Sequence, residues 1–208
     1  IYNKSFESLF IDDKGNPINT TKKYDLIIGN PPYSERNSKY KGLGELADIN
    51  RFEDYFIYRG ADLLSNGGVM ALVVPQSVLN GKTFDKTAKH LIEKGVYVEK
   101  AFRLPNGIFK GTDIGTDLII YRQDFEKADQ LKDRLIAGNY VKENPENILG
   151  EVVQKKNRFG KMEDYVKGSL EENVLPVLKN QDNIIVNNNT ENQTREEYEV
   201  EKKQDEEI

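Results

Sequence analysis

Short apolar runs that end at proline or glycine constrain the fold of this chain most strongly. Residues 26–28 are all apolar and are followed by Gly-Asn-Pro-Pro, and residues 69–74 form a longer apolar run that stops at Pro75. A third segment, residues 117–121, is apolar after Asp117 and follows a glycine-rich link. Runs of this length are typical of buried strands and fall far short of the roughly 20 residues that span a bilayer.

The segments between these runs have helical periodicity. Apolar side chains recur at helical spacing in residues 52–64, and residues 84–93 and 125–135 are also predicted to be helical. Residues 96–102 alternate as a strand does. Buried strands that alternate with helices predict an α/β domain with a largely parallel sheet. The last two strands have no helix between them, so we expect them to pair as an antiparallel hairpin.

Composition narrows the possible functions. The chain has 208 residues, 37% of them hydrophobic, and no cysteine, which excludes disulfides, thiolate zinc sites and a cysteine nucleophile. The lack of cysteine fits a cytoplasmic protein, and no signal-peptide pattern or membrane span is present. No metal site is predicted.

The net charge of −5 comes from the C-terminal tail. Residues 191–208 hold eight acids and three bases, a net of −5, so the other 190 residues are neutral overall. A neutral body with basic stretches can still bind DNA. We expect residues 187–208 to be a disordered polar tail and residues 124–186 to be an extension that contacts DNA.

The segment that carries chemistry is Asn30-Pro31-Pro32-Tyr33, directly after the first strand. Ligands of open α/β sheets bind beyond the carboxyl ends of the strands. The prolines stiffen the backbone, so that the Asn30 side chain and the Pro31 carbonyl can be held in fixed directions. Two such acceptors around a conjugated amine favour the sp³-like nitrogen that attacks a methyl sulfonium. Tyr33 offers a flat face for a planar ring.

This segment resembles motif IV of the amino-methyltransferases, and the Asn form after Asp25 is similar to adenine-N6 DNA methyltransferases of restriction-modification systems. Residues 68–77, 102–109 and 116–121 look like later motifs of the same family. The resemblance covers residues 1–123, and residues 144–160 are reminiscent of large helicase–methyltransferase proteins of mobile elements.

The resemblance implies a Rossmann-like fold, S-adenosylmethionine as cofactor and DNA as partner. A flipped adenine would be held by Tyr33 and Phe109, since a base inside a duplex is inaccessible. The residues matched to the cofactor are Phe6 and Gly29. The basic residues Arg36, Lys39 and Lys41 follow the motif and would contact phosphates, as would a second cluster at Lys155, Lys156, Arg158 and Lys161.

The chain departs from the family pattern in one respect. The family's Gly-rich cofactor loop and the acidic residue after the second strand are not found in this sequence. We therefore expect an incomplete methyltransferase fold that begins at about its third strand and that binds the cofactor poorly.

Other interpretations stay open from the sequence. The same motif occurs in enzymes that methylate RNA bases or protein glutamine, and a non-catalytic DNA-binding or scaffolding fragment is a further alternative. Asn-Pro-Pro-Tyr can be an ordinary turn, Phe109 can be a core aromatic, and basic clusters are commonly solvated faces. The recognition sequence and the oligomeric state do not follow from these residues.

Overall fold

The computed structural model describes most of the chain. The described residues are 4–35, 46, 49–80, 85–110, 113–136, 140–157, 159–180 and 194–205.

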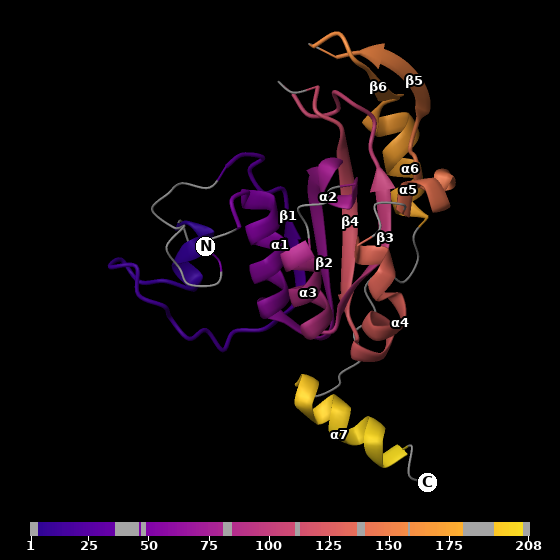
Figure 1. The fold of residues 1–208 in the computed structure, drawn as a ribbon. Helices are drawn as coiled ribbons and strands as arrows, with labels where there is room; N and C mark the ends of the chain where they lie inside the picture. The colour runs from indigo at the N-terminus through magenta and orange to yellow at the C-terminus, as the bar shows by residue number, and fades with distance from the viewer. Residues whose placement is uncertain are drawn as a thin grey trace.

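A four-stranded mixed sheet forms the centre of the molecule, in the order β1 (Tyr24–Gly29), β2 (Leu64–Pro75), β4 (Thr116–Gln123) and β3 (Val96–Arg103) (Figure 1). The α/β class and the antiparallel β3–β4 hairpin are confirmed. The prediction of a largely parallel sheet is wrong, because β1–β2 is the one parallel pair among the three described. The hairpin turn after β3 sends β4 back between β2 and β3, so β4 opposes both of its neighbours.

The main helices lie where their periodicity predicts them. Helices α1 (Phe52–Leu63), α3 (Asp85–Glu93) and α4 (Phe125–Ile136) agree with the expected ranges to within one residue at each end. A short helix, α2 (Ser77–Asn80), follows β2 directly. The His90 Nε2 atom lies 2.9 Å from Asp62 Oδ1, so this pair links α3 to the end of α1.

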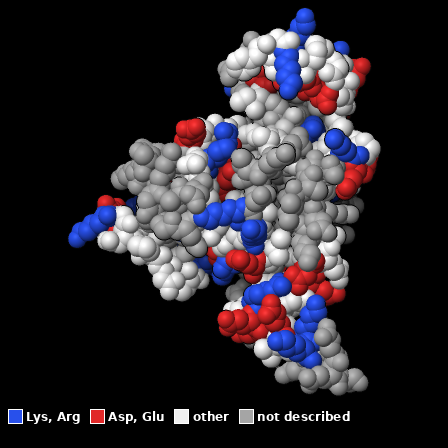
Figure 2. All heavy atoms as spheres, viewed as in Figure 1, with Lys and Arg blue, Asp and Glu red and all other residues white. Residues whose placement is uncertain are grey.

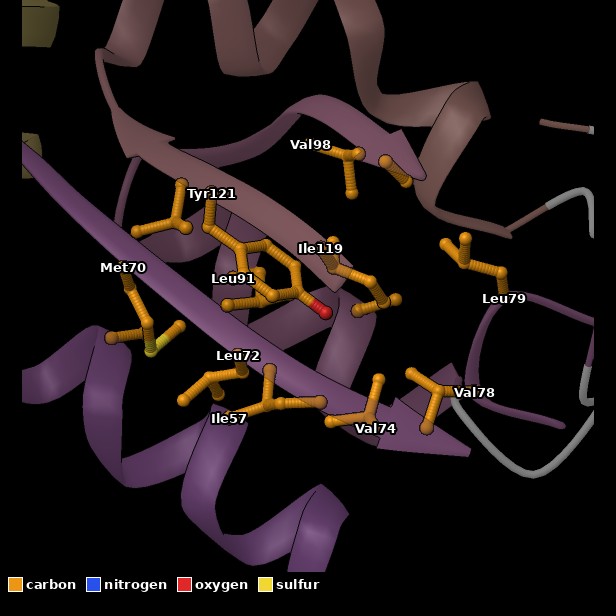
Figure 3. Packing of buried hydrophobic residues seen from close by; sticks show 14 of the residues in the cluster. Ile57, Met70, Leu72, Val74, Val78, Leu79, Leu91, Val98, Ile119 and Tyr121 are labelled. Carbon is orange, nitrogen blue, oxygen red and sulfur yellow. The ribbon is translucent and has the colours of Figure 1, made fainter. Parts of the chain in front are cut away.

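The core lies on both faces of the sheet. One face packs against α1 and α3 through residues such as Ile57, Met70 and Leu91, with Tyr121 at the centre of this cluster (Figure 3). The other face holds a smaller apolar cluster around Phe102. Because β2 contributes to both clusters, its sequence is apolar along most of its length.

Strand β1 differs from the buried strand that its sequence predicts. Its side chains at Tyr24, Leu26 and Ile28 are 40%, 39% and 73% exposed. Within the described residues β1 lies at the edge of the sheet and pairs with β2 alone. An apolar run therefore predicts a strand here correctly, but it does not determine how many neighbours the strand has.

The C-terminal third forms several small elements. The sequence predicted none of α5 (Tyr140–Glu143), η5 (Pro145–Asn147), the β5–β6 hairpin (Glu151–Lys156 and Met162–Lys167), η6 (Leu170–Val174) or α6 (Leu175–Lys179).

Part of the tail that the sequence predicts to be disordered forms a helix, and residues 187–193 and 206–208 of this tail lie outside the described residues. Helix α7 (Arg195–Asp205) contacts α4 through an Arg195–Asp129 ion pair of 2.9 Å and a Phe125–Tyr198 ring stack of 5.3 Å. None of the helices in the described parts of the chain is long and apolar enough to cross a membrane.

Candidate active site

The Asn-Pro-Pro-Tyr motif lies at one edge of the sheet, which we call the carboxyl edge. The parallel strands β1 and β2 both end there, since Gly29 pairs with Leu72 shortly before Pro75 closes β2. Strand β4 runs the other way and begins at the same edge with Thr116. The motif therefore lies where ligands of α/β sheets bind.

Inside the motif, the Tyr33 hydroxyl is bonded to Asn30. Tyr33 Oη donates to Asn30 Oδ1, and it also lies 3.2 Å from the backbone oxygen of Val73 in β2. These contacts fix the direction of the Asn30 amide and tie the motif to the neighbouring strand. An amide oxygen has two lone pairs, so Asn30 Oδ1 keeps one for a second donor.

The surroundings of Tyr33 keep its hydroxyl protonated. Burial, with a smaller contribution from the Glu53 carboxylate, raises the pKa of Tyr33 to about 12. Glu53 is fully buried in the first turn of α1, where Arg51 pairs with it. Because the phenol is neutral at ordinary pH, it acts as a hydrogen-bond donor toward Asn30.

The motif combines an anchored residue with an accessible one. Pro31 is buried, whereas the Asn30 side chain next to it is exposed. The turn continues into α1 through a hydrogen bond of 3.0 Å from the Phe52 amide to the Ser34 oxygen. A rigid turn that presents an amide oxygen to solvent suits recognition of a substrate N–H.

The two residues matched to the cofactor are engaged in packing. The Phe6 ring, in the short helix η1 (Phe6–Leu9), stacks on Phe56 with centroids 4.3 Å apart. A Cβ atom at Gly29 would lie 3.2 Å from Leu72 Cδ2, so the β1–β2 contact itself favours glycine. These residues do not by themselves make a site for S-adenosylmethionine, and their role beside the cofactor stays a prediction.

Phe109 lies in the loop between β3 and β4, at the carboxyl edge. Its ring is partly buried and packs against the apolar cluster around Phe102, so its stacking on a flipped base stays a prediction. The predicted phosphate contacts Arg36, Lys39 and Lys41 lie outside the described residues.

Sequence reasoning did not single out two polar side chains at the carboxyl edge. Gln76 follows β2 and Thr116 begins β4, and Gln76 Nε2 and Thr116 Oγ1 are buried without a hydrogen-bond partner among the residues that the structure describes. An unpaired buried polar atom costs about 1–3 kcal/mol. Such atoms beside the motif would be satisfied by a polar ligand. The available signal was the Pro-Gln-Ser ending of the second strand.

Sequence reasoning did not single out Asp54 either. It lies beside Glu53 in the first turn of α1, and burial together with the Glu53 charge raises the pKa of Asp54 to about 6. Nothing in the spacing of the sequence indicates this, because it depends on how α1 lies on the sheet.

Comparison with known proteins identifies the family. The Eco57I restriction-modification methylase family matches residues 2–106, which is half of the chain and includes the whole Asn-Pro-Pro-Tyr motif. The chain belongs to this family. The resemblance to restriction-modification methylases is thereby confirmed, and S-adenosylmethionine is the methyl donor of such enzymes. Phe109 lies just beyond the part of the chain that matches the Eco57I family.

Curated relatives share this region at moderate identity. Defense against restriction protein B of Escherichia phage P1 is 24% identical over 169 residues, 73% of this chain and 7% of the relative. Type II methyltransferase M.BsuBI of Bacillus subtilis is 34% identical over 42% of this chain and 17% of the relative. Restriction enzyme and methyltransferase RM.BcgI of Heyndrickxia coagulans is 32% identical over 46% and 14%. This Eco57I-family chain thus spans less than a fifth of each.

A solved structure overlaps in part. The type I restriction-modification methyltransferase subunit from Streptococcus thermophilus covers 56% of this chain, and the chain covers 26% of it, with 27% identity and a TM-score of 0.42.

Proposed function

We propose that this chain carries the substrate-amine part of a DNA methyltransferase site that transfers a methyl group from S-adenosylmethionine to N6 of adenine. The observation that carries the proposal is the Asn30 amide, exposed at the carboxyl edge and oriented by Tyr33. Membership of a restriction-modification methylase family supports methyl transfer to DNA.

The two acceptors of the motif act on the amine. Asn30 Oδ1 and the Pro31 carbonyl oxygen accept the two N–H groups of the adenine amine and draw its nitrogen toward a tetrahedral geometry. The lone pair then leaves conjugation with the ring and becomes available to an electrophile. No strong base is needed, since positioning and electrostatics lower the barrier.

The motif residues act on the adenine amine that receives the methyl group. S-adenosylmethionine supplies an electrophilic methyl group when it is bound, and we propose that Phe6 and Gly29 lie beside it. We propose that Tyr33 and Phe109 hold the flipped adenine by stacking, and that Arg36, Lys39 and Lys41 bind phosphates.

The test is N6-methyladenine in cellular DNA. The complete reading frame that encodes this chain, and its Asn30→Ala variant, are expressed in cells without adenine methylation, and the modified base is quantified by mass spectrometry. We expect methyladenine with the parent and a loss of at least 100-fold with Asn30→Ala, because oriented acceptors of this kind contribute about 10²–10³ in rate.

The matched control is Asn50→Ala, which changes an exposed Asn just before α1. It should leave the methyladenine level unchanged. A folded parent protein that gives no methyladenine in DNA would refute the adenine assignment. The same samples would then be searched for methylated RNA bases and methylated glutamine.

A further inference from the structure

The tip of the β5–β6 hairpin has an unusual composition. Residues 155–161 read Lys-Lys-Asn-Arg-Phe-Gly-Lys, four bases and no acid, in a chain whose net charge is −5. Phe159 is 78% exposed. Lys156 and Lys161 are also exposed, whereas Arg158 lies outside the described residues. The tip therefore presents an aromatic ring among positive charges.

The turn that presents Phe159 is well ordered by hydrogen bonds. Asn157 Oδ1 accepts from the backbone amides of Phe159, at 2.9 Å, and Lys161, at 3.0 Å. Gly160, at φ +79°, adopts the left-handed conformation that closes the turn. Its amide donates a hydrogen bond of 2.9 Å to the backbone oxygen of Asn157. The backbone at Phe159 is thus fixed before any partner binds, which lowers the entropic cost of binding.

The hairpin is fastened to the loop that carries Phe109. The Val166 amide in β6 donates to Asn106 Oδ1 at 2.9 Å, and the Asn106 amide donates to the Val166 oxygen at 2.8 Å. Lys155 adds an ion pair of 3.4 Å to Asp113 of the same loop. The hairpin extends beyond the carboxyl edge, where the candidate active site lies (Figure 1). Figure 2 shows Lys and Arg side chains at this end of the molecule, with acidic side chains beside them.

We propose that the β5–β6 hairpin is an arm that binds duplex DNA beside the active site. Lys156 and Lys161 contact phosphates, and Phe159 stacks on a base next to the adenine that is modified. Positive charge next to an exposed ring favours DNA, since phosphates bind the lysines and apolar side chains can enter a base step and unstack it. The proposal rests on the proposed function for its substrate, and it adds a residue that helps the target base leave the stack.

The test uses the 208-residue chain and a short fluorescein-labelled duplex DNA, with affinity measured by anisotropy at several salt concentrations. We expect Phe159→Ala to weaken binding by about fivefold or more, the loss typical of one stacked base. Phe159→Trp should retain the affinity. Lys156→Gln with Lys161→Gln should reduce the salt slope by about 0.9 per lysine.

Control variants lie at the opposite end of the molecule, on α7 (Figure 1). Val200→Ala removes an exposed apolar side chain, and Lys202→Gln with Lys203→Gln removes two exposed charges. Both should leave the affinity and the salt slope unchanged. Circular dichroism verifies that every variant is folded, which we expect because the changed side chains are exposed.

The hairpin proposal and the proposed function can fail separately. The proposal that the hairpin binds DNA is overturned by either of two results: tip variants bind DNA as tightly as the wild type, or the wild-type chain binds no DNA at low salt. Either result would point to a protein partner for this surface. Methylation can still occur in that case. Conversely, if the tip variants lose affinity but the complete protein makes no methyladenine, the arm stands and the methylation assignment fails.

Discussion

At the scale of single residues, the hydroxyl of Tyr33 determines how the catalytic motif is held. It donates to Asn30 Oδ1, the atom that we propose as an acceptor for the substrate amine. The second contact, to the Val73 oxygen at 3.2 Å, fixes the ring against β2. Tyr33 therefore has a positioning role that is separate from any stacking of its ring on a base.

Tyr33→Phe separates these two roles. The ring is kept and the hydrogen bond to Asn30 is lost, which should lower the methylation rate about tenfold, the equivalent of one hydrogen bond of about 1–1.5 kcal/mol. Tyr33→Leu, which also removes the ring, should lower it further. Single-turnover methylation of duplex DNA by the complete protein measures both. A Tyr33→Phe rate equal to that of the wild type would contradict the positioning role.

At the scale of elements, the end of α3 is packed against the start of α4. Gly95 follows α3 with φ +67°, and its amide bonds the Ile92 oxygen at 3.0 Å. A Cβ atom there would lie 2.4 Å from the Phe125 ring, the first residue of α4. The glycine thus allows both the left-handed backbone and the close contact between the two helices.

Gly95→Ala should destabilise the fold by about 2–5 kcal/mol, because the strained backbone costs about 1–2 kcal/mol and the overpacking against Phe125 about 1–3 kcal/mol. Gly15 offers a matched control, since it has φ +84° but nothing within 4 Å of an added Cβ. Gly15→Ala should cost only about 1 kcal/mol. Urea unfolding monitored by circular dichroism gives both values. Equal losses would exclude the contact with Phe125 as a cause.

At the scale of the whole molecule, the partly buried acid Asp54 makes stability depend on pH. Burial, the Glu53 charge and a weaker opposing effect of Arg51 together bring the pKa of Asp54 to about 6 from 3.8. The folded chain therefore binds a proton more tightly than the unfolded chain does. This contribution to stability is complete below about pH 4 and is lost as pH rises through about 6.

Asp54→Asn should remove this dependence. At pH 7 the variant should be more stable than the wild type by about 1–2 kcal/mol, given about 1.4 kcal/mol per pKa unit and partial screening by solvent. The difference should shrink toward pH 4. Urea unfolding at several pH values checks both statements, and Glu196→Gln on the exposed face of α7 serves as control. A constant difference across pH would contradict the assignment to Asp54.

The sequence alone determined the class of fold, most of the main elements and the catalytic motif. Apolar periodicity and turn residues act locally, so α1, α3, α4 and the strands could be read from neighbouring residues. The Asn-Pro-Pro-Tyr motif could be recognised for the same reason, because proline restricts the backbone φ angle wherever it occurs.

Only the tertiary structure decided how these pieces meet. Strand direction in the sheet, the exposure of β1 and the contact of Tyr33 with Val73 depend on segments that are far apart in the chain. The β5–β6 hairpin buries few side chains and has no clear periodicity, so it could not be predicted from its sequence. Helix α7 contains five of the eight acids of the tail that was predicted to be disordered, and its contacts with α4 are visible only in the folded chain. Local sequence determines which helices and strands form, whereas tertiary packing determines which of them lie next to each other.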